Sequence, residues 1–198
     1  MNSVTASLPA NLYLRNLSLA DLDQVDKLES QAFSENERAS REKIAYRLRN
    51  CADICFGLFQ TCDDPNAEIL VGHTLSTKTN SFFITDQAME MPELDPVTHT
   101  PVSEQEKLGH LPTGPTVALH SLAVAKNFRK QGLAQVLMKY TAEAISSDNA
   151  TTRNRADRIS IIVHGELVPF YQHLGYKDNG PSKCAHGGEK WNDMWLEL

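Results

Sequence analysis

The stretch that decides the fold reads Val117-Ala-Leu-His-Ser-Leu-Ala-Val124, then Ala125-Lys-Asn-Phe-Arg-Lys130, then Gln131-Gly-Leu-Ala-Gln-Val-Leu137. Residues 117–124 are mostly apolar and predict a strand. Residues 131–147 predict an amphipathic helix, whose apolar stripe holds Leu133, Val136, Leu137, Tyr140, Ala144 and Ile145. A strand that turns directly into a helix exposes free backbone N–H groups and the positive end of the helix dipole. The stretch therefore predicts a binding site for a pyrophosphate.

The turn itself carries the residue types that such a site needs. Gly132 has no Cβ and lets the backbone approach an anion, and Ala134 keeps the next position small. Arg129 and Lys130 add positive charge beside it. Three glycines would mark a dinucleotide-binding loop, and a Gly-Lys-Ser/Thr ending would mark a Walker A loop. The turn has neither pattern, so it is a different kind of phosphate-binding turn.

The rest of the chain predicts strands and helices in alternation. Ser18 and Asp21 have the spacing of a capping box before one helix, and Ser40 precedes another. The predicted strands are 11–17, 54–60, 69–76, 117–124 and 158–164, with final strands at Tyr176 and 194–198. A turn that holds Asp63, Asp64, Pro65 and Asn66 is predicted between the second strand and the third strand. The last helix covers 167–174 and ends at Gly175. Residues 78–115 predict a long loop with one short helix near 85–91, inserted between two strands that are neighbours in one sheet.

Length and composition exclude several classes of protein. A chain of 198 residues suits one domain, residues 1–198. Its net charge of -6 argues against nucleic-acid binding and is compatible with a cationic substrate. No apolar run is long enough for a membrane span, and the first eleven residues lack the features of a secretory signal. The four cysteines have no zinc-binding pattern. We expect a cytoplasmic monomer with reduced cysteines, no metal and no membrane partner.

Two segments resemble motifs of the GNAT superfamily of acetyltransferases. Residues 129–134 resemble motif A, and residues 167–176, which include Phe170 and Tyr171, resemble motif B. Residues 119–124, 128–132, 167–171 and 180–182 look like the arylalkylamine, or serotonin-type, N-acetyltransferase family. Residues 28–35 and 187–194 look like its microbial and fungal members. The resemblance covers most of the chain except the loop at 78–115.

The resemblance implies an α+β fold, with a mixed, mostly antiparallel central sheet and helices on both faces. It also implies that the fourth and fifth strands splay apart and that acetyl-CoA lies in the gap. The pantetheine would follow the backbone of Leu122, Ala123 and Val124, and the pyrophosphate would lie on the turn. The implied acetyl-CoA-binding residues are Leu122, Ala123, Val124, Arg129, Lys130, Gln131, Gly132, Leu133, Ala134, Gln135 and Tyr171.

The expected chemistry is direct attack of an amine on the acetyl group in a ternary complex, without a covalent enzyme intermediate. A primary amine with a pKa near ~10 must first lose a proton. We expect His120 to accept it, so that the rate rises through the histidine range of ~6–7.5, and Tyr171 to protonate the leaving thiolate. Members with two histidines carry one at the position of Ala118, so a two-histidine relay is in doubt here. His164 and Glu29 are the other candidate bases.

The identity of the amine stays open at the level of sequence. Phe33 is expected to line the amine pocket, which favours an arylalkylamine, whereas the acidic loop favours a polyamine. One alternative is a protein or peptide N-acetyltransferase, which needs an open groove. The other is a non-catalytic acetyl-CoA-binding module, which has no use for His120 and Tyr171 together.

Overall fold

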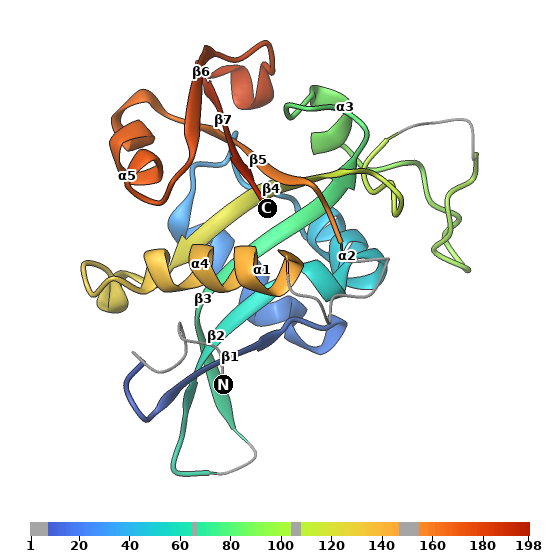
Figure 1. Ribbon diagram of the computed structural model, residues 1–198. Coiled ribbons are helices and arrows are strands. Elements are labelled where there is room, and N and C mark those ends of the chain that lie inside the picture. Colours follow the sequence, from blue (N-terminus) through green and yellow to red (C-terminus); the bar gives the residue numbers. More distant parts are fainter. Residues whose placement is uncertain (1–7, 65–66, 104–107, 147–154) are drawn as a thin grey trace.

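A computed structural model shows a seven-stranded mixed sheet with helices on both faces, and it describes residues 8–64, 67–103, 108–146 and 155–198 (Figure 1). The strands are β1 (Leu12–Asn16), β2 (Phe56–Thr61), β3 (Glu68–Thr79), β4 (Thr116–Val124), β5 (Arg158–Val163), β6 (Lys177–Pro181) and β7 (Asn192–Glu197). Their order across the sheet is β1-β2-β3-β4-β5-β7-β6. All neighbouring strands are antiparallel except β4 and β5, which are parallel.

The α-helices are α1 (Leu22–Ala32), α2 (Arg41–Asn50), α3 (Asp86–Met89), α4 (Leu133–Ser146) and α5 (Val168–His173). Short 3-10 turns precede or join them at Leu19–Asp21, Ala52–Ile54, Lys126–Phe128, Gly165–Leu167 and His186–Gly188. One core cluster joins Leu119 of β4 to Met138 of α4 and Tyr171 of α5. Another joins Ala123 of β4 to Leu28 of α1. The α4 and α5 helices therefore cover one face of the sheet, and α1 and α2 cover the other (Figure 1).

The parallel strands β4 and β5 pair over only part of their length. Their register runs from Thr116 opposite Arg158 to Ala118 opposite Ser160. The rest of β4 has paired neighbours on its β3 side alone, so the sheet opens at its middle, as the resemblance implies. A bulge marks the same place, because Leu75 pairs with Ser121 and Ser76 pairs with Leu119. His120 is the extra residue, and it and Ser121 both line the same cavity.

The sequence predicted the order of these elements, and their bounds differ in a few places. β3 extends to Thr79, so Lys78 and Thr79 belong to a strand and not to the long loop. Ile54 lies in a 3-10 turn before β2, and α4 begins at Leu133. The capping box of Ser18 and Asp21 and the short helix in the loop are confirmed. Parts of three predictions lie outside the described residues: most of the first eleven residues, which were expected to lack a secretory signal, Pro65 and Asn66 of the predicted turn, and Ser147 at the end of the predicted helix.

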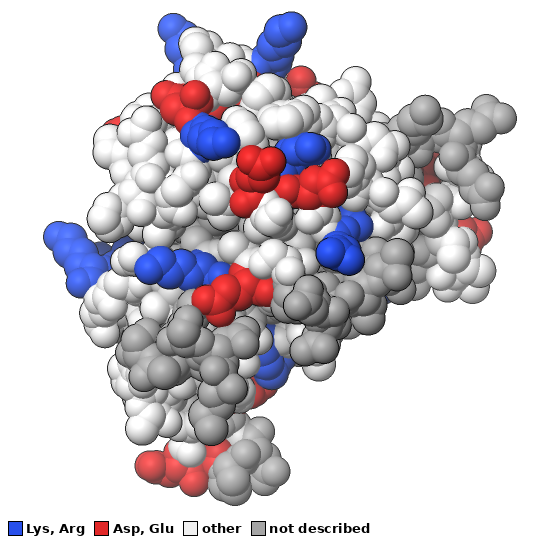
Figure 2. Space-filling view, viewed as in Figure 1, with Lys and Arg blue, Asp and Glu red and all other residues white. Residues whose placement is uncertain are grey.

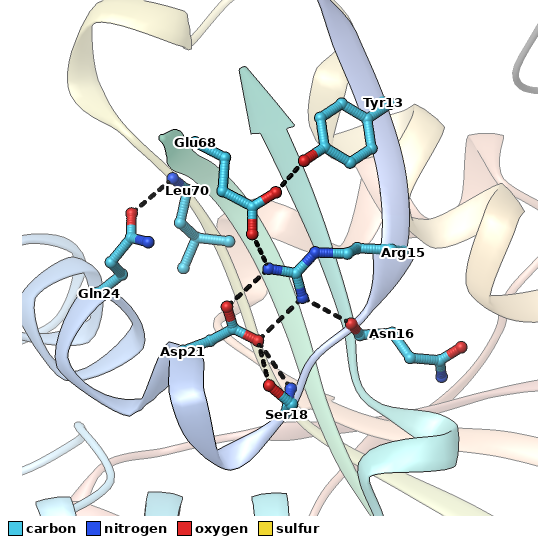
Figure 3. A network of polar contacts seen from close by, with 8 residues as sticks. All are labelled: Tyr13, Arg15, Asn16, Ser18, Asp21, Gln24, Glu68 and Leu70. Carbon is cyan, nitrogen blue, oxygen red and sulfur yellow. Dashed lines mark hydrogen bonds and ion pairs between the residues drawn. The ribbon is translucent and has the colours of Figure 1, made fainter. Parts of the chain in front are cut away.

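A polar network fixes the start of α1 to the edge of the sheet (Figure 3). The guanidinium of Arg15 on β1 donates through both nitrogens to the carboxylate of Asp21, at 2.7 and 2.9 Å, and also to Glu68 on β3. Tyr13 donates to the other oxygen of Glu68. Ser18 completes the capping box on Asp21. This network sets the direction in which α1 crosses the sheet.

No helix in the described part of the chain is long and apolar enough to cross a membrane.

Candidate active site

The turn between β4 and α4 has the geometry of an anion site. Lys130 and Gly132 both have positive φ, 60° and 77°, and α4 begins directly after them. A Cβ built on Gly132 meets nothing within 4 Å, so the space in front of this backbone is open. Arg129 is tied to the strand through Nε, which donates to the carbonyl of Val124 at 3.0 Å. Basic side chains lie at this end of the molecule (Figure 2).

A cavity of about 480 Å³, the turn cavity, lies beside this backbone. Its lining includes these residues of the set expected to bind acetyl-CoA: Leu122, Ala123, Val124, Arg129, Lys130, Gly132, Leu133, Ala134, Gln135 and Tyr171. Gln131 is absent from the lining, and its side chain donates instead to the carbonyl of Asn127 at 3.2 Å. The structure thus gathers around one cavity ten of the eleven residues that the sequence assigned to the cofactor.

Two smaller cavities adjoin the turn cavity on the side of α1. The middle cavity, of about 120 Å³, shares Leu122, Leu167 and Tyr171 with the turn cavity. The inner cavity lies deeper and is lined by Glu29, Lys43, Arg47 and other residues. Phe33 lines all three cavities. The turn and middle cavities therefore share a wall at Tyr171, the middle and inner cavities share one at His120 and Ser121, and Phe33 borders all three.

His120 lies on the wall between the middle and inner cavities, and both of its ring nitrogens already have neighbours. Nε2 is 2.7 Å from Thr77 Oγ1, and Nδ1 is 2.9 Å from Met89 Sδ. A thioether is a weak acceptor, so the Nδ1 contact is the one that a substrate can replace at little cost. His120 can accept a proton at Nδ1 when its Nε2–H donates to Thr77 Oγ1, and a group in the cavity that displaces Met89 then reaches that lone pair.

Burial lowers the pKa of His120 well below its ordinary value, and the positive charges of Arg47, His186, Lys43 and His110 lower it further. The imidazole is then neutral at neutral pH and can accept a proton, but it is a weaker base than an exposed histidine. This moves the expected rise in rate to a pH below the ordinary histidine range of ~6–7.5.

Tyr171 lies on α5 at the junction of the turn and middle cavities. The residue is 7% exposed, and its hydroxyl makes no hydrogen bond within the described part of the chain. Burial raises the pKa of Tyr171 well above its ordinary value. The phenol is therefore protonated near neutral pH, but it is a weaker acid than an exposed tyrosine.

Glu29 forms the floor of the inner cavity and is almost completely buried. Its Oε1 lies 2.8 Å from Nε2 of His73 and accepts the hydroxyl of Ser121, while its Oε2 accepts the N–H of Ala39 at 3.3 Å. Burial raises the pKa of the Glu29 carboxyl, but the hydrogen bonds to His73, Ser121 and Ala39 and the charge of His73 outweigh it and hold the pKa below its ordinary value. Glu29 is thus an anion inside the cavity.

The sequence analysis missed several residues that the fold brings to the inner cavity. Arg47 of α2 is 3% exposed and donates to the carbonyl of Met89 at 3.3 Å, and Lys43 pairs with Glu90 at 2.8 Å. The short helix of the long loop thereby becomes a wall of the site. Arg47 lies near the apolar positions Ile44 and Leu48 of its helix, and a charged residue among buried neighbours was the available signal.

A cluster of rings closes the far side of the middle cavity. His164 Nε2 is 3.2 Å from Glu37 Oε1, and its ring stacks on Trp191 at 4.2 Å. His186 Nε2 is 3.0 Å from the carbonyl of Glu37, and Trp191 donates to the carbonyl of His186 at 2.8 Å. His164, the alternative base, therefore lines the middle cavity alone, whereas His120 lines both the middle and the inner cavity.

Within the described ranges, no group of three or more His, Cys, Asp or Glu side chains is arranged to hold a metal ion. Cys51, Cys55, Cys62 and Cys184 are free thiols.

The model of the acetyltransferase (GNAT) domain matches residues 70–198, which is more than half of the chain. The chain therefore belongs to the GNAT acetyltransferase family. Among curated relatives, the serotonin N-acetyltransferase of Mesocricetus auratus is 36% identical over 89 residues. That match covers 45% of this chain and 41% of the relative, so the chain spans less than half of the relative's length.

Solved structures with the same fold resemble nearly the whole chain. The loading GNATL domain of CurA from Lyngbya majuscula has a TM-score of 0.66 at 16% identity and covers 94% of this chain and 97% of its own. Naa50 of Arabidopsis thaliana, in complex with the bisubstrate analogue CoA-Ac-MVNAL, has a TM-score of 0.62 at 12% identity and covers 96% and 100%. At identities this low, the TM-scores establish a shared fold and nothing more.

Proposed function

We propose that this protein is an acetyl-CoA-dependent N-acetyltransferase that acetylates a small primary amine by direct attack in a ternary complex. The observation that carries the proposal is the meeting of two cavities at Tyr171. On one side lies an open backbone turn with the donors and charge for a pyrophosphate. On the other lies the middle cavity, which shares His120 and Ser121 with the inner cavity, where Glu29 is buried.

Each side chain has a role in this proposal. Acetyl-CoA supplies the acetyl group as a thioester, held by the turn residues and the open edge of β4. Glu29 attracts the ammonium group of the amine, and His120 accepts its proton at Nδ1, in place of the Met89 contact. The Tyr171 hydroxyl donates a proton to the leaving thiolate. A non-catalytic binding module has no need of these groups around a second cavity.

The lining of the middle cavity supports an arylalkylamine. Phe33, Trp191, Leu119 and Ile161 offer flat and apolar surface to an aromatic ring. A polyamine would instead place its distal ammonium group near Glu37. The hydrogen bonds that join His186, Trp191 and Glu37 fix side chains that line the middle cavity, and its volume of about 120 Å³ supports a small acceptor over a peptide.

A thiol-release assay with acetyl-CoA tests the proposal against a panel of arylalkylamines, polyamines and peptides. We expect the highest kcat/KM with an arylalkylamine. Release with peptides alone would assign the protein to the N-terminal or lysine acetyltransferases. Binding of acetyl-CoA without release on any amine would assign it to the non-catalytic modules.

A further inference from the structure

His73 lies in the centre of the sheet, on β3, at a position where an apolar side chain is the ordinary choice. It is completely buried, with 0% exposure. Within the described residues its Nδ1 has no hydrogen-bond partner, and its Nε2 contacts only Glu29 at 2.8 Å and Ser121 at 3.3 Å. A buried polar atom without a partner costs free energy. Burying the imidazole of His73 therefore costs folding free energy, and among its described contacts only those of Nε2 offset this cost.

These contacts leave Glu29 with a defined free position. An ionised carboxylate has about four lone-pair sites. Three donors fill three of them: His73 and Ser121 on Oε1, and the Ala39 N–H on Oε2. The remaining site is on Oε2, and Glu29 lines the inner cavity. An ammonium group is the natural donor for it, because it carries both the charge and the N–H bonds that a buried carboxylate needs.

We propose that His73 is a positioning residue for the acceptor amine: its imidazole holds the Glu29 carboxylate ionised and turned so that one oxygen can bind the ammonium group. This rests on the proposed acetyltransferase function. His73 itself does not touch the amine. His73 does not line the inner cavity and acts only through its contact with Glu29, which does.

The other charged and titratable groups around Glu29 do not supply this contact. Those lining the same cavity are Glu37, Lys43, Arg47, His120 and His186. Arg47 donates to a backbone carbonyl, Lys43 pairs with Glu90, and His120 contacts Thr77 and Met89. Glu37 contacts His164 through its carboxylate and His186 through its backbone carbonyl. His73 alone among the described basic side chains contacts the Glu29 carboxylate, at 2.8 Å.

The test compares His73→Leu with His73→Gln, which keeps an N–H donor. Thermal unfolding and calorimetry with acetyl-CoA show whether each variant is folded with an intact turn cavity. For His73→Leu we expect the KM for the amine to rise about 10- to 100-fold, the range for losing a hydrogen bond to a charged group, with a smaller change in kcat. In the proposal only the ionised Glu29 carboxylate binds the ammonium group, so KM should rise at low pH, where Glu29 is protonated. This rise should begin at a higher pH in His73→Leu, because burial without the His73 donor raises the pKa of Glu29. His73→Gln should restore most of both.

A folded His73→Leu variant with the wild-type KM and pH profile would show that His73 only fills the core. So would a His73→Gln variant that performs no better than His73→Leu. A nitrogen NMR measurement of the His73 ring, in the wild type and in Glu29→Gln, needs no activity and decides the matter if His73→Leu does not fold. We expect the Nε2 signal to move on Glu29→Gln, and an unmoved signal overturns the proposal. A wild type that releases no thiol with any amine refutes the proposed function instead, and leaves the NMR result standing.

Discussion

Two polar networks anchor α1, one at its start and one near its end, and they differ in what they leave open. At the start, Arg15 donates to Asp21 and Glu68, and Ser18 and Tyr13 complete the pairing of these carboxylates (Figure 3). At the other end, Glu29 pairs with His73 and Ser121 but retains a free lone pair at a cavity. The first network is closed, because solvent reaches the 31% exposed side chain of Glu68 and fills its remaining lone-pair sites, whereas Glu29 is buried and its remaining site needs a partner from the cavity.

This difference indicates that the network at Arg15 and the network at Glu29 have separate roles. A closed network of opposite charges at the sheet edge contributes to stability and positions a helix. An open, buried network costs stability and persists at sites of chemistry. Changes on the cavity side should therefore alter rate or binding, and changes at Arg15 should alter stability alone.

The largest effect on the cavity side is expected for Tyr171→Phe. The hydroxyl acts only as the thiolate leaves, so its loss should lower kcat by about 10²–10⁴-fold, with little change in acetyl-CoA affinity. Steady-state kinetics of thiol release measures this. Tyr176→Phe is the matched control, because the hydroxyl of Tyr176 is buried without a partner in the described part of the chain. Equal losses in both variants would mean that the aromatic packing, and not the Tyr171 hydroxyl, sustains the rate.

His120→Gln should lower kcat/KM by about 10²-fold near neutral pH, at the low end for general-base catalysis because a buried histidine is a weak base. The neutral imidazole is the active form, and burial lowers its pKa, so the wild-type rate should rise with pH below the ordinary histidine range. The variant should lose this rise and follow the titration of the free amine. His164→Gln should keep it. If His164→Gln removes the rise and His120→Gln does not, the two histidines exchange roles, and if neither does, the proton leaves by water or by a carboxylate such as Glu29.

Gly132→Glu should weaken acetyl-CoA binding at least tenfold, or about 1.4 kcal/mol, measured by calorimetry. The new carboxylate would stand in the open space beside the turn, where the phosphates are expected. Gly180→Glu is the control, since Gly180 also has positive φ, 82°, and open space, but does not line the turn cavity. Unchanged affinity in folded Gly132→Glu would remove the case for an anion site at this turn.

The smallest effect, and the one that separates the two networks, is expected for Arg15→Met. We expect a loss of about 1 kcal/mol in the free energy of unfolding, because solvent screens a pair whose Arg15 side chain is 31% exposed. Denaturant unfolding measures this, and kcat/KM should not change. Arg41→Met, at an exposed pair with Asp23, should cost still less. A fall in kcat/KM for Arg15→Met would show that the edge network is part of the site.

The ion pair of Arg15 with Asp21 should also make the free energy of unfolding depend on pH in the acid range. Burial raises the pKa of Asp21, but Arg15 and Ser18 outweigh it and leave the pKa below its ordinary value. The contribution of a carboxyl with a lowered pKa is present above its unfolded pKa, near ~3.9, and is lost as pH falls through the folded value. Arg15→Met should therefore reduce the loss of stability in acid.

Much of the fold followed from local pattern. The strand 117–124, the turn and the following helix were predicted because apolar periodicity and glycine placement are properties of neighbouring residues. The open backbone at Gly132 is likewise local, since free N–H groups exist at the start of any helix. The bounds of β3 were less predictable: Lys78 and Thr79 are polar, and only pairing with Val117 and Thr116 of β4 keeps them in a strand.

The sequence by itself thus determined the class of fold and the side of the site that faces the turn. Only the tertiary structure decided the other side. Glu29 meets His73 across 44 residues and Ser121 across 92, and no local pattern encodes such contacts. The bulge at His120 and the approach of Met89 from the long loop depend on how β3, β4 and α3 pack together. Helix termini carry their donors wherever they lie, but a buried carboxylate acquires its partners, its charge and its free lone pair only when distant elements enclose it.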